Sequence, residues 1–292
     1  MVKIQYSLIA LALVVVLVIT GCGWYYVHPL SYFLFREDMP QVQILKFDEV
    51  PTAESYDFLW SHPDEPYLKR LRAEYELDKI VAGSNSDYEK IQAICLWVHG
   101  LWKHHGFNEP QKSDPISILQ EVKQGKRFRC VEYAIVINGC LNALGIPSRV
   151  LGLKTEDVES RRYGAGHVVI EAYLQDINKW ILIDGQWYVI PLLNGTPLNA
   201  VELQNAIAQK LPGLNILSLS ETKPDEYFRW IGPYLFYFDI RLDNRVGVSD
   251  RSRKKLMLVP IGANKPKVFQ QKWPIGDVIY THSVYAFYTI PE

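Results

Sequence analysis

The feature that most constrains this chain is a cysteine at the start of an apolar helical pattern. Two apolar strand-like segments follow it, the first with a histidine and the second with an aspartate. Cys130 opens the helical pattern, His167 opens the first strand-like segment, and Asp184 closes the second. Residues 176–179 between the two segments form a turn sequence that is typical of a β-hairpin. We therefore expect an α+β fold in which a helix with the thiol packs on an antiparallel sheet with the imidazole and the carboxylate.

These three side chains are the components of a Cys-His-Asp acyl-transfer site. The thiolate is the nucleophilic form of cysteine, and a helix N-terminus favours it through unpaired N–H groups and the helix dipole. A neighbouring imidazole holds the pair as thiolate and imidazolium, while a carboxylate on its other nitrogen fixes the tautomer. We therefore assign Cys130 as the candidate nucleophile, His167 as the proton carrier and Asp184 as the group that orients His167.

The same residues lie in motifs that resemble the transglutaminase-like superfamily. Residues 141–150 match the pattern Leu-x-x-x-Gly-Ile-Pro-x-Arg-Val, residues 166–171 match Gly-His-x-x-x-Glu, and residues 180–184 match Trp-x-x-x-Asp. The resemblance covers about residues 88–190. It implies a papain-like core, in which the catalytic helix packs on an antiparallel sheet, and a cofactor-independent Cys-His-Asp triad. The residues that follow this core imply a β-rich C-terminal extension.

Two features of the family pattern need separate comment. Many members carry glycine two residues before the cysteine, whereas this chain has Phe128, a bulky side chain that can narrow the acyl-binding cleft. In many members an aromatic or amide side chain also completes the oxyanion hole. The candidates here are Trp97, Trp102 and Gln124, and the sequence does not choose between them.

Residues 1–23 have the pattern of a targeting segment. Lys3 precedes a continuous apolar run, residues 8–19, which has the length of a signal h-region and is short for a membrane span. The run is followed by Thr20-Gly21-Cys22, which resembles a bacterial lipobox, and we expect Cys22 to be lipidated. An uncleaved anchor helix and a plain signal peptide are the alternatives. Each places the body of the protein outside the cytoplasm at the membrane surface.

The remaining cysteines and histidines favour neither a disulfide framework nor a metal site. Cys95 and Cys140 lie in apolar helical patterns, as small buried side chains do. Cys95 and His99 share one helix face, and His104 and His105 follow, yet no spacing typical of metal ligands completes the set. We therefore expect no metal, and we consider His105 as a candidate substrate contact at the edge of the cleft.

The chain divides into four parts: the targeting segment 1–23, a lead-in with a helix at 24–83, the transglutaminase-like core at 84–195, and the extension at 196–292, first mixed and then β-rich. Besides the helical pattern within 51–83, helices are expected at about 88–102, 116–124, 130–144 and 200–210. Strands are expected at about 42–47, 149–153, 167–174, 180–184, 234–238, 256–259, 278–280 and 285–288.

The composition excludes some partners and is compatible with others. A net charge of −1 with 22% charged residues gives no global electrostatic field that would attract nucleic acid.

We expect an extracytoplasmic, membrane-anchored thiol enzyme that attacks an amide or ester carbonyl and releases the acyl group to water or to an amine. Its expected substrate is a peptide or protein, with cell-wall peptide among the candidates. The alternative is a non-catalytic binding or scaffold lipoprotein at the cell surface with the same fold.

Overall fold

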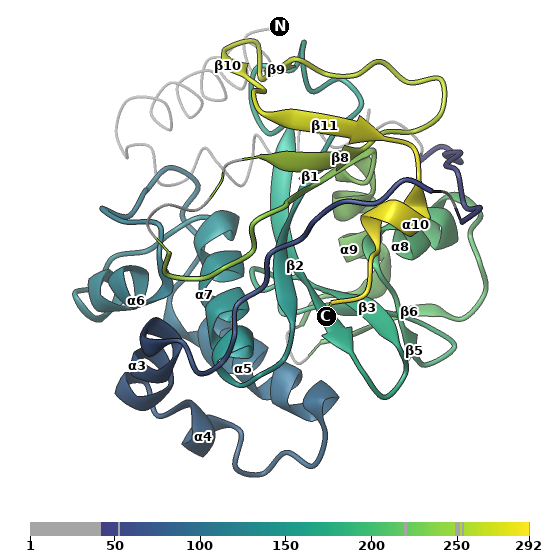
Figure 1. Ribbon diagram of the computed structural model, residues 1–292. Helices are drawn as coiled ribbons and strands as arrows, with labels where there is room; N and C mark the ends of the chain where they lie inside the picture. Colours follow the sequence, from purple (N-terminus) through teal and green to yellow (C-terminus); the bar gives the residue numbers. More distant parts are fainter. Residues whose placement is uncertain (1–41, 52, 219–220, 249–251, 253, 292) are drawn as a thin grey trace, which may run out of the picture. The chain divides into compact units, whose positions relative to one another are not determined.

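The computed structural model describes residues 42–51, 53–218, 221–248, 252 and 254–291 (Figure 1). The predicted targeting segment 1–23, with Cys22, lies outside the described residues. Over the part of the chain that is described, no helix has both the length and the hydropathy that a membrane crossing requires.

A six-stranded sheet forms the centre of the described fold. Its strand order is β11-β8-β7-β1-β2-β3, and neighbours run antiparallel except for β8 and β11, which are parallel. Three strands that follow the predicted core in sequence, β7, β8 and β11, therefore continue the same sheet, whereas β5 and β6 pair with β4 and β9 pairs with β10 in two smaller sheets. The bounds are β1 (Ser148–Lys154), β2 (Gly166–Leu174), β3 (Lys179–Ile183), β7 (Tyr237–Arg241), β8 (Lys255–Leu258) and β11 (Val278–Thr281).

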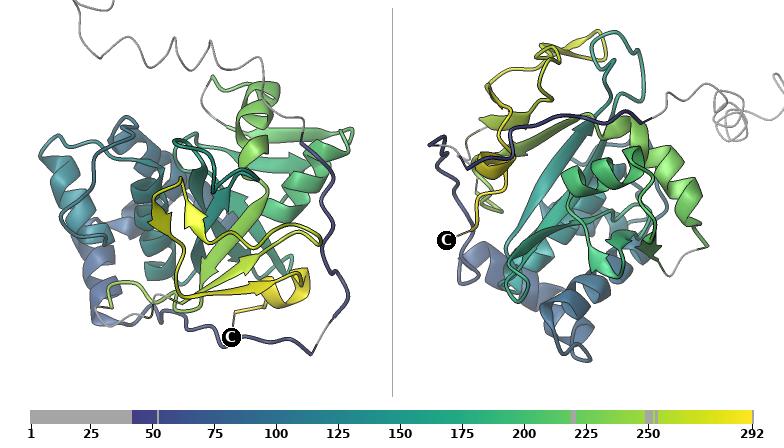
Figure 2. Two further views of the ribbon diagram at one scale, coloured as in Figure 1. Left: turned by 90° about the horizontal axis from the view of Figure 1, so that it is seen from above. Right: turned by 90° about the vertical axis from the view of Figure 1, so that its right-hand side faces the viewer.

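Helices cover both faces of this sheet (Figure 2). One face packs against α3 (Pro66–Glu74), α4 (Leu77–Ile80), α5 (Asp87–Leu101), α6 (Pro115–Lys123) and α7 (Cys130–Ala143). The other face packs against α8 (Ala200–Ala208) and α9 (Pro224–Ile231). The smaller elements are β4 (Ile190–Leu193), β5 (Thr196–Pro197), β6 (Leu214–Leu217), the 3-10 turn η1 (Gly232–Tyr234), β9 (Val268–Phe269), β10 (Trp273–Pro274) and α10 (Val284–Phe287).

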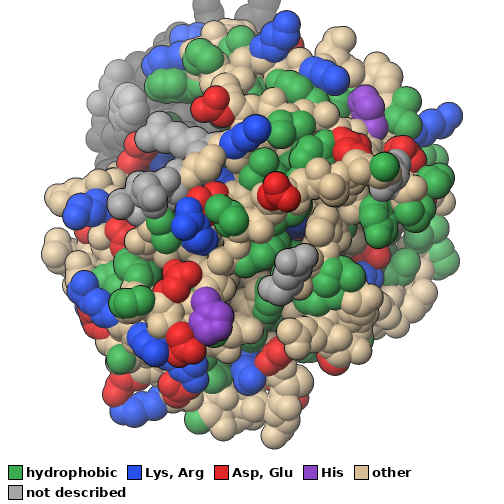
Figure 3. Space-filling model, viewed as in Figure 1, with side chains coloured by type: hydrophobic (Ala, Val, Ile, Leu, Met, Phe, Trp, Pro, Cys, Tyr) green, Lys and Arg blue, Asp and Glu red, His purple; other side chains and the backbone are tan. Residues whose placement is uncertain are grey.

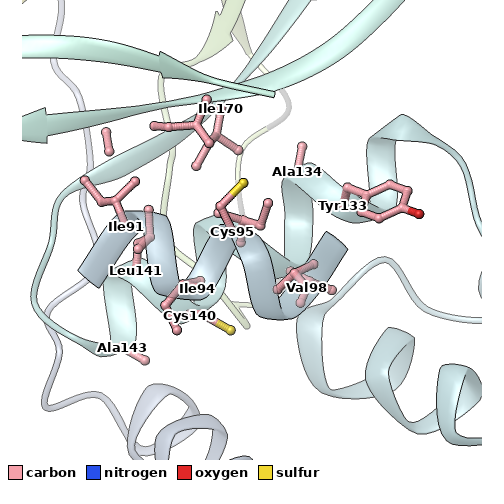
Figure 4. Packing of buried hydrophobic residues seen from close by; sticks show 14 of the residues in the cluster. Ile91, Ile94, Cys95, Val98, Tyr133, Ala134, Cys140, Leu141, Ala143 and Ile170 are labelled. Carbon is pink, nitrogen blue, oxygen red and sulfur yellow. The ribbon is translucent and has the colours of Figure 1, made fainter. Parts of the chain in front are cut away.

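The apolar character of β2 follows from this double covering. Val169 lies in the cluster with α8 and α9, whereas its neighbour Ile170 lies in the cluster with α5 and α7, because successive side chains of a strand point to opposite faces. Figure 4 shows side chains of α5, including Ile91 and Cys95, meeting those of α7, including Leu141, close to Ile170. The strand that carries His167 is therefore held between two apolar layers.

The surface seen in Figure 3 has no large patch of side chains of one charge. Basic and acidic side chains are interspersed there, with hydrophobic side chains between them. This pattern agrees with the near-zero net charge of the whole chain.

Most expected elements are present within one or two residues of their predicted bounds, and the exceptions have local causes. Residues 285–288 are not a strand: α10 begins there because the Ser283 hydroxyl accepts a hydrogen bond from the Ala286 N–H and caps the helix. Residues 42–47 form no strand either, and the Lys46 carbonyl accepts instead from the Ile261 N–H at 2.8 Å. The strand expected at 234–238 starts at Tyr237, because η1 occupies the preceding residues.

Candidate active site

Cys130 is the first residue of α7, and the local sequence fixes that start. The Glu132 carboxylate accepts from the Arg129 backbone N–H at 3.0 Å and pairs with the Arg129 guanidinium at 2.8 Å. Glu132 is fully buried, so this contact is a structural one that ends the preceding loop. The N–H groups of the first helical turn have no partner within the helix. The backbone N–H of Cys130 is therefore available to an acceptor outside the helix.

The three described thiols have different surroundings. Cys95 and Cys140 are fully buried, and burial raises the pKa of both thiols. Cys130 is half-buried, and all three are free of disulfide bonds. Because a nucleophile must reach its substrate, Cys130 is the thiol of the described residues that is placed for this role.

His167 connects the thiol to the carboxylate. Its Nε2 lies 2.8 Å from Asp184 Oδ2, and both side chains are buried. Burial favours the neutral imidazole, but the charges of Asp184 and Cys130, with hydrogen bonds to both, raise the pKa of His167 to about 10. Because Nε2 is engaged by Asp184, Nδ1 is the nitrogen left for Cys130. The structure thus brings together the three residues that the sequence places far apart.

Asp184 is held by four donors. Its Oδ1 accepts from the backbone N–H groups of Gln186 at 3.0 Å and Trp187 at 3.2 Å. Its Oδ2 accepts from His167 and also from the Tyr227 hydroxyl at 3.1 Å. A carboxylate offers about four lone-pair positions, so the carboxylate is satisfied and its orientation is fixed.

The residue after Asp184 is clamped between two helices. A Cβ on Gly185 would lie 2.3 Å from Ile137 Cδ1 and 3.2 Å from Tyr133 Cβ, both of α7, so a larger residue here would force these side chains to shift. The Gly185 carbonyl lies 3.1 Å from His99 Nδ1 of α5, which is its hydrogen-bond partner. This clamp places the two backbone donors that hold the Asp184 carboxylate.

Aromatic rings from the second half of the chain surround His167. Trp230 of α9 lies edge-to-face with the imidazole at a centroid distance of 4.7 Å, and Tyr234 lies 6.0 Å away. Trp187 packs on Trp230 at 4.9 Å. These rings keep bulk water from the imidazole, which strengthens its interaction with Asp184.

The three oxyanion-hole candidates occupy different positions. Trp102 is buried, stacks on Tyr133 of α7 at 4.2 Å, and has a buried Nε1 without a hydrogen-bond partner among the described residues. Trp97 is partly buried and packs against Tyr75 at 6.3 Å. Gln124 is exposed and caps the C-terminal end of α6. Because buried donors are normally paired, the unpaired indole N–H beside α7 distinguishes Trp102.

Phe128 lies in the core instead of a cleft. Its side chain is 0% exposed and meets the Trp102 ring edge-on at 6.3 Å. Its carbonyl accepts from the His105 N–H at 2.8 Å, and the Arg127 carbonyl accepts from Asn108 Nδ2 at 2.8 Å. A fully buried ring has no surface with which to narrow an acyl-binding cleft, so Phe128 supports Trp102 and the 104–109 loop instead.

The histidines outside the triad form no metal centre in the described part of the chain. No three His, Cys, Asp or Glu side chains gather there in a way that would hold an ion. Burial, together with the charge of His167, lowers the pKa of His104. His105, the candidate substrate contact, has a buried Nδ1 with no hydrogen-bond partner among the described residues.

Sequence reasoning missed Tyr227 and Trp230. The available signal was the apolar spacing of Tyr227, Trp230 and Ile231 after Pro224, which is typical of one face of a short helix. That pattern predicts α9 but not its location, because the contact with Asp184 joins residues 43 positions apart.

Part of the chain resembles known proteins. Residues 77–185 match the sequence profile of the transglutaminase-like superfamily. No curated protein matches the chain. The solved structures that it resembles include a proposed cysteine protease from Cytophaga hutchinsonii (15% identity, 59% of this chain and 55% of that chain, TM-score 0.34) and red sea bream transglutaminase (14% identity, 65% and 38%, TM-score 0.34). A further structure, described as a TGase, has 17% identity over 41% and 31% of the two chains, with a TM-score of 0.30. The chain thus spans about half or less of the length of these structures.

Proposed function

Because residues 77–185 form a transglutaminase-like domain, we propose that this protein is a thiol enzyme that acts on amide or ester carbonyls through an acyl-enzyme on Cys130. The observation that carries the proposal is the connection of Asp184, His167 and Cys130, with the thiol at the first residue of a helix. This arrangement favours the thiolate–imidazolium pair, which is the reactive form of a cysteine nucleophile.

In the proposed acylation step, the Cys130 sulfur attacks the carbonyl carbon and the carbonyl oxygen becomes an oxyanion. We propose two donors for that oxyanion: the backbone N–H of Cys130, which lies in the first turn of α7, and the Trp102 indole N–H, which has no partner among the described residues. His167 then gives its proton to the leaving amine or alcohol as the carbon–leaving-group bond breaks. The products are the thioester at Cys130 and a neutral His167.

In the proposed deacylation step, neutral His167 takes a proton from the acceptor, which attacks the thioester carbonyl; the carbon–sulfur bond then breaks and the Cys130 thiolate leaves beside protonated His167. With water as the acceptor the reaction is hydrolysis, and with an amine it is acyl transfer. The same residues serve both outcomes, so the acceptor is decided outside the triad. We propose peptides or proteins as substrates, with cell-wall peptide as the candidate that fits the proposed location.

The test uses iodoacetamide labelling of the full-length protein in detergent, mapped to individual cysteines by peptide mass spectrometry. The proposal expects rapid labelling of Cys130 with a pH midpoint well below the free-thiol value of about 8.5, and a midpoint restored toward 8.5 in His167→Ala. Cys95 and Cys140 serve as internal controls, because burial protects both. An ordinary midpoint at Cys130 in the wild type would contradict the proposal.

A second assay tests the acyl-enzyme directly. Mixing the protein with 4-nitrophenyl acetate should release a burst of nitrophenolate and leave an acetyl group on Cys130, with neither event in Cys130→Ser. Equal bursts from the wild type and this variant would show that Cys130 is not the nucleophile.

We also propose that the protein is anchored at the extracytoplasmic face of the membrane through lipidated Cys22. The support is the lipobox-like sequence that ends the apolar run. Detergent phase partitioning tests it: the wild type should enter the detergent phase, and Cys22→Ser should not. A Cys22→Ser variant that stays in the detergent phase would indicate an uncleaved anchor helix, and a wild type in the aqueous phase would indicate a plain signal peptide.

A further inference from the structure

We infer that Tyr227 is a positioning residue that shares the Asp184 carboxylate with His167 and limits how strongly that carboxylate holds the imidazolium. The inference rests on the proposed function, because it concerns the proton that His167 must release and take up. It adds a residue from outside the transglutaminase-like domain at 77–185 to the same site.

The geometry of α9 supports this role. Tyr227 and Trp230 are three residues apart and therefore share one face of the helix. The Tyr227 hydroxyl donates to Asp184 Oδ2 at 3.1 Å, and the Trp230 ring contacts His167 at 4.7 Å. One helix thus touches both partners of the His167–Asp184 bond, and it does so from the sheet face opposite to α5.

The Tyr227 hydroxyl affects the protonation of His167 because both groups donate to the same Asp184 oxygen. Oδ2 accepts from both His167 Nε2 and Tyr227, so the two donors divide the negative charge of the same atom. The hydroxyl bond is strongest when the imidazole is neutral, because the carboxylate then carries its charge without a cationic neighbour. Tyr227 therefore favours neutral His167, which is the form that deacylation requires.

Tyr227 stays a donor over the working range of the enzyme. Burial, with the charge and hydrogen bond of Asp184, raises the pKa of the Tyr227 phenol well above its usual value. Its other titratable neighbours and those of the His167–Asp184 pair come from α5, α7, the 104–109 loop and η1. They are Cys95, Cys130, His104 and Tyr234.

The experiment is an NMR titration of the His167 ring in the full-length protein in detergent, with Tyr227→Phe beside the wild type. Tyr237→Phe is the matched control, because it removes a tyrosine hydroxyl that donates at 2.9 Å to the Asn264 carbonyl, away from the site. We expect the His167 midpoint to rise by about half a pH unit or more in Tyr227→Phe and to stay unchanged in the control. Assignment comes from the signal that disappears in His167→Gln.

The kinetic readout is the pH–rate profile of deacylation in 4-nitrophenyl acetate hydrolysis. Its rising limb follows the loss of the His167 proton. The limb should move to higher pH in Tyr227→Phe, and a shift of half a unit lowers the rate on the rising limb about threefold. 3-Fluorotyrosine at position 227 keeps the shape of the side chain and makes the phenol a stronger donor, so it should move both midpoints downward. This second variant keeps the test informative if Tyr227→Phe does not fold.

The outcomes separate this inference from the proposed function. An unchanged or lowered His167 midpoint in Tyr227→Phe, or a lower rate with an unmoved limb, would overturn the role of Tyr227 while leaving the triad intact. An ordinary Cys130 alkylation midpoint and an ordinary histidine titration in the wild type would overturn both.

Discussion

At the scale of single residues, the candidate site depends on one proton that His167 holds between two negatively charged groups. The charges of Asp184 and Cys130 overcome the effect of burial and raise the pKa of His167 to about 10. With this pKa, His167 is a cation at neutral pH, as the proposed thiolate–imidazolium pair requires.

The first prediction follows from the pH range of this cation. His167 should remain protonated beside the Cys130 thiolate up to about pH 10 and lose its proton above that value. Acylation by an amide uses this proton for the leaving amine, so kcat/KM for an amide substrate should fall as pH rises through about 10. A profile of kcat/KM from pH 6 to 11 checks it, and a decline centred near the ordinary histidine value of about 6.5 would contradict it.

The second prediction concerns Asp184. In Asp184→Asn the side-chain N–H₂ would face His167 Nε2, which selects the wrong tautomer and removes the charge that stabilises the imidazolium. Activity should fall by roughly 10²–10⁴-fold, and the Cys130 alkylation midpoint should rise toward about 8.5. Asp157→Asn, which breaks an exposed ion pair with Arg161, is the control and should leave both quantities unchanged.

The third prediction separates Trp102 from Trp97 as the oxyanion-hole donor. Trp102→Phe removes the unpaired indole N–H but keeps an aromatic ring against Tyr133. We expect kcat to fall by roughly 10²–10³-fold with an unchanged rate of Cys130 alkylation, because alkylation forms no oxyanion. Trp97→Phe should keep wild-type values for both, and a matching loss in kcat there would point to a packing effect instead.

At the scale of elements, the sequence predicted what depends on local pattern. The helix that begins at Cys130 and ends before Gly145, and the hairpin that carries His167 and Asp184, have the expected bounds because apolar periodicity and turn residues decide them. What it could not predict is the contact that α9 makes, because no local rule relates Tyr227 to a carboxylate on a distant strand. The strand predicted at residues 285–288 was wrong for a different reason. The helix cap at Ser283 outweighs the strand propensity of the aromatic residues that follow.

The fourth prediction tests the clamp between α7 and the loop after β3. Gly185→Ala places a Cβ 2.3 Å from Ile137 Cδ1, so the buried Ile137 side chain, the helix or the loop must shift. We expect the free energy of unfolding to fall by about 1–3 kcal/mol, measured by urea denaturation. Gly100→Ala is the matched control, because a Cβ there meets nothing within 4 Å, and it should be neutral or stabilising by up to about 1 kcal/mol.

At the scale of the whole described fold, a buried ion pair joins distant parts of the chain. Arg149 of β1 and Glu171 of β2 are both 0% exposed and pair at 2.7 Å. Arg149 Nη1 also donates to the Phe287 carbonyl at 2.9 Å, and Glu171 Oε1 accepts from the Ala200 N–H at 3.0 Å. The pair therefore connects the central strands to α8 and α10.

The fifth prediction concerns this pair. Arg149→Met leaves the Glu171 charge buried without its partner and should lower the free energy of unfolding by about 3–5 kcal/mol. The double variant Arg149→Met/Glu171→Leu should recover part of that loss, because no uncompensated charge remains. Urea denaturation of the wild type, both single variants and the double variant gives the coupling free energy between the two side chains. Additive losses would show that the two side chains act independently.

The sheet order has a consequence for the time at which the candidate site is complete. Strand β1 pairs with β2 on one side and with β7 on the other, so residues synthesised far apart must meet before the sheet is complete. Cys130 leaves the ribosome well before Tyr227 and Trp230, which contact the His167–Asp184 pair. The surroundings of the His167–Asp184 pair are therefore complete only after α9, the later helix, has docked.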